Sequence, residues 1–83
     1  MKQYLSNPPQ IGQVLLSARK SKGLTQAEAG ARLGVSQSRL SVLESDPAAM
    51  TLEQLLGLID LYDLRLQVLD KASASAAAGG AEW

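Results

Sequence analysis

Apolar residues recur every three or four positions in several short segments of the chain, which is the spacing of one face of an amphipathic helix. The first segment follows Asn7 and Pro8, which suit a helix start, and ends before Gly23, a residue that readily terminates a helix. Thr-Gln-Ala-Glu at residues 25–28 is a capping box, so a second helix begins there and continues to Gly34.

Two further helices are predicted after Gly34. Ser36 can cap a third helix, which carries Leu40 and Leu43 on one face and stops at Asp-Pro, residues 46–47. A second capping box at residues 51–54 begins a fourth helix, which has the strongest apolar stripe in the chain. That stripe consists of Leu52, Leu55, Leu56 and Ile59.

The spacing changes to two at Leu64, where Leu64, Leu66 and Val68 alternate with their neighbours as in a half-buried strand. No other segment has this pattern, so we expect the strand to pair with the same strand of a second copy, antiparallel across a two-fold axis. The alternative is that this stretch extends the fourth helix or packs irregularly on it. The predicted fold is therefore mainly α, with four or five helices and one C-terminal strand that forms an intersubunit sheet.

Eighty-three residues suffice for one domain, and every periodic segment lies within residues 1–71. Residues 72–81 contain only Ala, Ser and Gly, which bury too little apolar surface to compensate for the entropy lost on ordering. We therefore predict a flexible tail over residues 72–83. It ends in Glu82 and Trp83, and we expect Trp83 to be an exposed ligand for a partner rather than a side chain folded back on the core.

The composition excludes several kinds of protein. The chain has no cysteine and no histidine, and it has no glycine-rich phosphate-binding loop. There is thus no organised catalytic or metal-ligating set, and we expect no enzymatic activity, cofactor, metal or small-molecule ligand. No apolar stretch is long enough for a membrane span or a signal peptide, so we expect a cytoplasmic protein.

The formal net charge is zero, but the charges are unevenly distributed. Residues 1–40 hold six basic residues and one acidic residue, whereas residues 41–83 hold two basic and seven acidic residues. This division predicts one basic surface for a polyanion and a separate surface for another partner. The alternative is chance clustering on solvated faces.

The second and third helices, separated by Gly34, have the lengths and spacing of a helix-turn-helix. In this motif the first helix crosses the DNA backbone and the second presents its N-terminal residues to bases in the major groove. The amide of Gln37 suits adenine, the amide of Gln26 suits a phosphate, and nearby lysines supply sequence-independent attraction. The candidate DNA-binding residues are Lys20, Lys22, Gln26, Ser36, Gln37, Ser38, Arg39 and Ser41.

Each of these residues also has an ordinary structural explanation. Glutamine and serine at helix starts are commonly caps or solvated residues, and Arg39 suits guanine or phosphate equally. Arg19 is as well explained by an internal ion pair with Glu44 as by DNA contact.

Gly30 lies inside the second predicted helix, where glycine lowers helix stability by about 1 kcal/mol relative to alanine. We therefore expect that close packing against the third helix requires a glycine at this position.

Three segments carry a resemblance to a known family: Gly-Leu-Thr-Gln at 23–26, Leu-Gly-Val-Ser-Gln-Ser at 33–38, and the run from Leu40 to Glu44. They resemble the helix-turn-helix of the Xre (Cro/C1-type) repressors, whose domains are lambda-repressor-like. Within that family, the arrangement of residues 7–71 and the terminal Glu-Trp are similar to the HipB-like antitoxins.

The resemblance implies a homodimer that binds palindromic operator DNA at the nucleoid, represses its own operon and neutralises a HipA-type serine/threonine kinase toxin. It also implies that Leu64, Leu66 and Val68 form the intersubunit sheet, and that Glu82 and Trp83 reach the toxin or a protease. Two other functions stay open: a stand-alone Xre-family repressor without a toxin partner, and a helical protein interaction module that never meets DNA.

Overall fold

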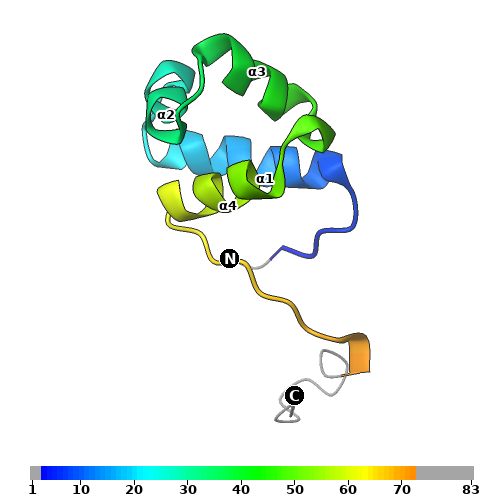
Figure 1. Cartoon of the computed structure of the whole chain (residues 1–83). Helices are drawn as coiled ribbons and strands as arrows, with labels where there is room; N and C mark the ends of the chain where they lie inside the picture. The colour runs from blue at the N-terminus through cyan, green and yellow to red at the C-terminus, as the bar shows by residue number, and fades with distance from the viewer. Residues whose placement is uncertain (1–2, 73–83) are drawn as a thin grey trace.

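The computed structural model describes residues 3–72, so the predicted tail lies outside the described residues except for Ala72. Four α-helices form the domain, as the apolar spacing predicts, and Figure 1 shows α3 on one side with α1 and α4 below it. The helices are α1 (Pro8–Ser21), α2 (Gln26–Leu33), α3 (Gln37–Ser45) and α4 (Leu52–Leu61), with a short 3-10 helix η1 (Pro47–Ala49) between α3 and α4.

Side-chain caps define where the helices begin. Asn7, Thr25, Ser36 and Thr51 each accept a hydrogen bond from the backbone N–H three residues later, and all but Ser36 belong to reciprocal capping boxes. In the box of α2, the Thr25 backbone N–H donates to the Glu28 carboxylate over 2.9 Å. This bond, with smaller contributions from the Thr25 hydroxyl and Arg32, lowers the pKa of Glu28.

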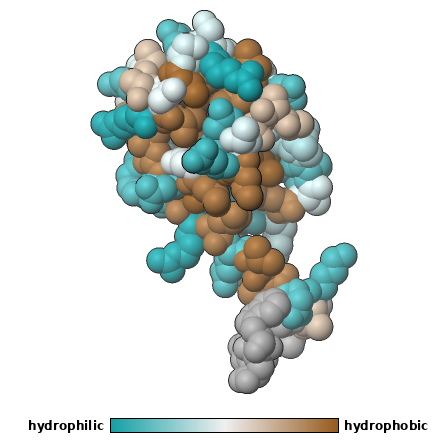
Figure 2. Space-filling model, in the orientation of Figure 1, coloured by the Kyte–Doolittle hydropathy of each residue, from teal (hydrophilic) through white to brown (hydrophobic). Residues whose placement is uncertain are grey.

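All four helices contribute to one apolar core. Leu58 is the buried residue of α4. Leu55 and Ile59, which belong to the predicted stripe, are partly buried and pack against the core. Leu52 and Leu56, the other two members of the stripe, are 68% and 46% exposed. Figure 2 shows apolar residues gathered on the face where α1 and α4 lie. The buried apolar residues are Leu15, Ala18, Ala29, Leu40, Leu43, Leu58 and Tyr62.

The predicted C-terminal strand is not formed in the single chain. Residues 64–70 have no regular secondary structure, and Figure 1 shows them leading away from the helices. A strand needs a second strand with which to pair, and no strand is assigned within residues 3–72. The prediction of a strand at Leu64, Leu66 and Val68 is therefore wrong for one copy, and the intersubunit sheet stays a prediction about two copies.

The alternative prediction was that this stretch extends the fourth helix or packs irregularly on it, and the extension of the helix is wrong. Asp63 adopts a left-handed conformation with φ 58°, and the N–H groups of Asp63 and Leu64 donate to Asp60 and Ile59. These two bonds satisfy the last carbonyl groups of α4 and reverse the chain, as in a Schellman motif. Leu64 then packs against the core, and the chain leaves the domain.

Gly30 lies inside α2 and faces the turn that leads to α3. A Cβ atom at this position would lie 2.9 Å from the carbonyl oxygen of Val35 and 3.2 Å from that of Ser36. Both atoms belong to the backbone, which cannot move aside as a side chain can. The expected close packing at Gly30 is confirmed, and its contact is with the turn and the cap of α3.

We predict that Gly30→Ala lowers the free energy of unfolding by about 1–3 kcal/mol, because overpacking outweighs the gain in helix propensity. Gly57→Ala is the matched control in α4, since its Cβ would meet only the end of the Leu33 side chain, Cδ1, at 2.8 Å. We expect the control to be close to neutral. Urea unfolding followed by circular dichroism compares the two variants, and equal stability would contradict the role assigned to the Gly30 backbone contact.

Candidate nucleic-acid interface

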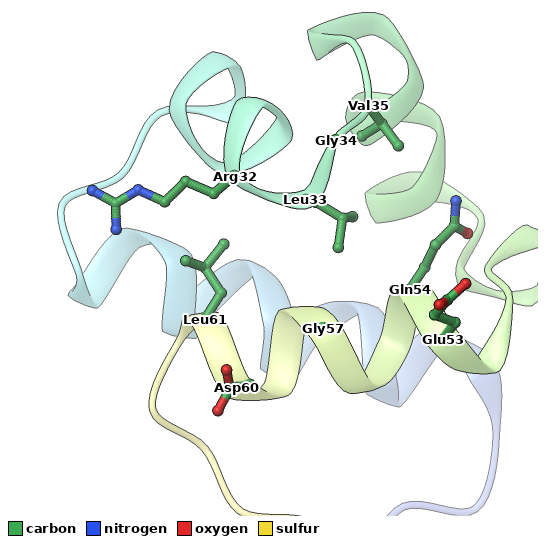
Figure 3. A pocket seen from close by; sticks show the side chains of 9 residues that line it. All are labelled: Arg32, Leu33, Gly34, Val35, Glu53, Gln54, Gly57, Asp60 and Leu61. Atoms are coloured by element: carbon green, nitrogen blue, oxygen red, sulfur yellow. The ribbon is translucent and has the colours of Figure 1, made fainter.

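The turn between α2 and α3 brings the two helices into a helix-turn-helix. Gly34 adopts φ 88°, a left-handed conformation that glycine reaches without strain. The N–H groups of Gly34 and Val35 both donate to the Gly30 carbonyl over 2.8 Å, which closes the end of α2. Figure 3 shows this turn facing α4. The helix-turn-helix prediction is confirmed.

The outer face of α3 is polar at its N-terminal end. Leu40 and Leu43 are completely buried and hold the other face of the helix against the domain. The Ser36 hydroxyl accepts the Arg39 N–H over 3.0 Å, so Ser36 caps the helix in addition to any contact with DNA. All residues of α3 that the sequence nominated for DNA contact are exposed: Gln37, Ser38, Arg39 and Ser41.

A buried ion pair fixes α3 to α1. Arg19 Nε donates to Glu44 Oε2 over 2.6 Å, and Arg19 Nη2 donates to Glu44 Oε1 over 3.3 Å. The guanidinium therefore binds both carboxylate oxygens. Their side chains are only 10% and 9% exposed. Arg19 Nη1 also donates to the Leu24 carbonyl over 2.8 Å, in the loop that leads to α2. Of the two explanations offered for Arg19, the internal ion pair with Glu44 is confirmed.

Gln26 joins the same network. Its Nε2 atom donates to Glu44 Oε1 over 2.9 Å, and its side chain is half-buried. The carboxylate of Glu44 therefore orients the Gln26 amide at the start of α2, where unpaired helix N–H groups also lie. One amide hydrogen and the carbonyl oxygen of Gln26 have no partner within the described residues and remain available to a ligand.

The basic residues at the end of α1 differ from each other. Lys22 forms an ion pair with Asp63, just beyond the end of α4, which partly neutralises its charge. Lys20 is exposed and has no ion pair in the part of the chain that the structure describes. Arg39 Nη2 approaches the Ala49 carbonyl at 3.5 Å, so its guanidinium is directed along α3 toward η1.

Tyr62 lies near the Arg19–Glu44 ion pair. The residue is 3% exposed, and among the described residues its hydroxyl is buried without a hydrogen-bond partner. Burial raises the pKa of Tyr62, and the nearby Glu44 carboxylate raises it further, while Arg19 acts in the opposite direction. The neutral phenol is therefore favoured beside the ion pair.

A groove of about 630 Å³ lies between the turn and α4. Its lining, shown in Figure 3, combines apolar side chains such as Leu33 and Leu61 with the charged side chains of Arg32, Glu53 and Asp60. The described residues contain no cluster of three or more acidic, histidine or cysteine side chains that could hold a metal ion. Within the same range no helix has the length and apolar character needed to cross a membrane.

Two of the predicted contact residues cannot be placed, and one exposed residue of α3 was not predicted. Glu82 and Trp83 lie outside the described residues. Val42, which the sequence reasoning did not assign, is 44% exposed in the middle of α3. The signal that could have identified it is its position four residues after Ser38, on the side of the helix away from Leu40.

Comparison with known families agrees with this geometry. A helix-turn-helix family model, HTH_3, matches residues 15–69, well over half of the chain. The chain therefore belongs to this helix-turn-helix family, in agreement with its resemblance to the Xre (Cro/C1-type) repressors.

Among curated relatives, antitoxin HipB of Escherichia coli (strain K12) is 26% identical over 73 residues, which cover 88% of this chain and 83% of HipB. The solved HipB–O1–O2 complex contains a chain with a TM-score of 0.74 and 25% identity, covering 83% of this chain and all of that one. A HipA–HipB–O2–O3 complex matches with a TM-score of 0.75 and 24% identity, over 84% and 99% of the two chains.

We predict that Glu44→Leu lowers the free energy of unfolding by about 3–5 kcal/mol, because it leaves the Arg19 charge buried without a partner. Combining it with Arg19→Met should restore most of that loss, since two apolar side chains of similar volume carry no buried charge. Urea unfolding of both single variants and the double variant measures the coupling. A single-variant loss below about 1 kcal/mol, the range of exposed pairs, would contradict a structural role for the pair.

Proposed function

We propose that the protein is an antitoxin and transcriptional autorepressor that binds palindromic operator DNA as a homodimer and neutralises a HipA-type serine/threonine kinase toxin. The observation that carries the DNA-binding part is the α2–turn–α3 geometry, which presents Gln37 and Ser38 on the exposed N-terminal turn of a helix buried on its other face. Similarity to antitoxin HipB, and the presence of HipA beside HipB in a solved complex, support the toxin part. The proposed function is non-catalytic and is exercised in the cytoplasm, at the nucleoid.

In the proposed complex, α2 lies across the DNA backbone. The free amide atoms of Gln26 and the N–H groups at the start of α2 contact one phosphate, and Glu44 holds Gln26 in place for this contact. Lys20 adds attraction that is independent of sequence, and Lys22 contributes less because Asp63 pairs with it.

The N-terminal turn of α3 enters the major groove. Gln37 has the donor and acceptor needed to contact adenine through N6 and N7, and Ser38 and Ser41 can serve either bases or phosphates. Arg39 is directed toward η1 and suits a phosphate at the edge of the groove better than a base at its centre.

The exposed segment after α4 is the proposed dimerisation element. Val68 is 80% exposed and Leu66 46%, and the backbone of residues 64–70 forms no strand in one copy. Pairing with the same segment of a second copy would cover these side chains and satisfy their backbone groups. It would also set the distance between two recognition helices for a palindromic site.

The tail carries the remaining proposed contact. Glu82 and Trp83, at the end of an Ala-Ser-Gly spacer, reach the toxin or a protease. Retention of the kinase encoded by the neighbouring gene during purification separates an antitoxin from a stand-alone repressor. A gel shift with genomic fragments at physiological salt separates both from a protein interaction module.

For the DNA-binding part, we expect Gln37→Ala to weaken binding to a duplex selected from a random pool by about 1–3 kcal/mol and to leave binding to random duplex nearly unchanged. Gln13→Ala, which removes an exposed amide on α1, is the matched control and should change neither. The measurement is fluorescence anisotropy over a series of salt concentrations. Equal losses on both duplexes would refute base contact by Gln37, and an affinity independent of salt would refute the phosphate contacts.

For the dimer, proline at Val68 or at Gln67 should weaken association, because one of these adjacent N–H groups must point toward the partner strand. Val68→Thr keeps the N–H group and the branched shape, so it should remain dimeric. Sedimentation equilibrium compares the three variants with the unmodified chain. A dimer unaffected by either proline would overturn the intersubunit strand.

A further inference from the structure

The outer face of α3 carries one apolar side chain. At 100° per residue, Ser38, Ser41, Val42 and Ser45 lie on the side opposite the buried Leu40 and Leu43. Three of these four residues are serines with exposed hydroxyl groups, and the fourth is Val42, with 44% of its surface exposed. Val42 is therefore the one position on this face where the chain offers a hydrophobic contact.

Folding does not require a valine at this position. Leu40 and Leu43 already fill the core side of α3 and are completely buried. In an exposed helix interior, valine has a lower helix propensity than alanine, because its branched side chain loses χ1 freedom. The same stiffness holds the two methyl groups in one orientation before any ligand arrives, which suits a specific contact.

Two polar neighbours of Val42 are directed at backbone carbonyl groups. The Ser45 hydroxyl donates back to the carbonyl groups of Ser41 and Val42, over 3.1 and 3.2 Å. Arg39, three residues before Val42, is directed toward the Ala49 carbonyl. With 44% of its surface exposed, Val42 is accessible to a ligand that approaches α3 from outside.

We infer that Val42 contacts the 5-methyl group of a thymine in the major groove and thereby determines one position of the recognised sequence. Thymine is the base that presents an apolar group in this groove. Val42 lies one turn beyond Ser38, on the order of 6 Å along the axis, so its base pair is about two steps from the one that Gln37 and Ser38 meet. The inference rests on the proposed DNA binding.

The test removes the methyl group from the DNA and the side chain from the protein. A duplex selected by the unmodified protein from a random pool is remade with deoxyuridine in place of each thymine in turn. At one position in each half-site, we expect affinity to fall about fourfold, the value of one buried methyl group. With Val42→Ala the same replacement should have no effect, so the two changes are not additive.

Two further variants separate a base contact from a general loss of binding. Val42→Thr keeps one γ-methyl group and the branched shape, so it should retain the deoxyuridine effect. Leu5→Ala removes an apolar side chain of similar exposure, 38%, from the segment before α1 and must leave that effect unchanged. Circular dichroism confirms that each variant is folded.

The outcomes distinguish this inference from the function on which it rests. If the unmodified protein and Val42→Ala both prefer the selected duplex but respond alike to every deoxyuridine, Val42 does not contact thymine, and the proposed DNA binding stands. If the unmodified protein does not prefer the selected duplex over random duplex, both the proposed DNA binding and the inference about Val42 fail.

Discussion

The buried pair between Arg19 and Glu44 is the constraint on which the interface depends. Arg19 belongs to α1 and Glu44 to α3, and the pair extends to the Leu24 carbonyl and the Gln26 amide. A charge of either sign left alone at 10% exposure would be strongly unfavourable, so α1 and α3 must keep the separation that lets both groups bond. The pair therefore restricts where α3 lies relative to α1, and Glu44 in turn orients the Gln26 amide.

The exposed side chains divide the surface of the domain into a mainly polar face and a more apolar one. The outer face of α3 is polar apart from Val42, whereas α4 and the segment after it expose Leu52, Leu56, Leu66 and Val68. A polar face with a single apolar contact suits base edges, which are themselves mostly donors and acceptors. Apolar side chains on a small domain suit association, because a chain of this size buries a smaller share of its surface than a larger one.

Much of the interface could be predicted from the sequence because its signals are local. Thr25 and Glu28 form the expected capping box, and Gly34 adopts the expected left-handed turn. Each depends on backbone geometry within a few residues, which residue type specifies directly. The strand at Leu64–Val68 could not be settled in this way, since alternation of apolar residues does not supply the neighbour with which a strand must pair.

By itself, the sequence determined the four helices, their caps and the turn that joins α2 to α3. Only the tertiary structure decided which polar side chains bond to other parts of the molecule and which side chains are exposed to solvent. It placed Arg19 in an ion pair across 25 residues, oriented Gln26 through Glu44, and left Val42 exposed. These outcomes depend on helices that are distant in sequence, and the buried Arg19–Glu44 pair acts together with the packing of Leu40, Leu58 and their neighbours to hold them in place.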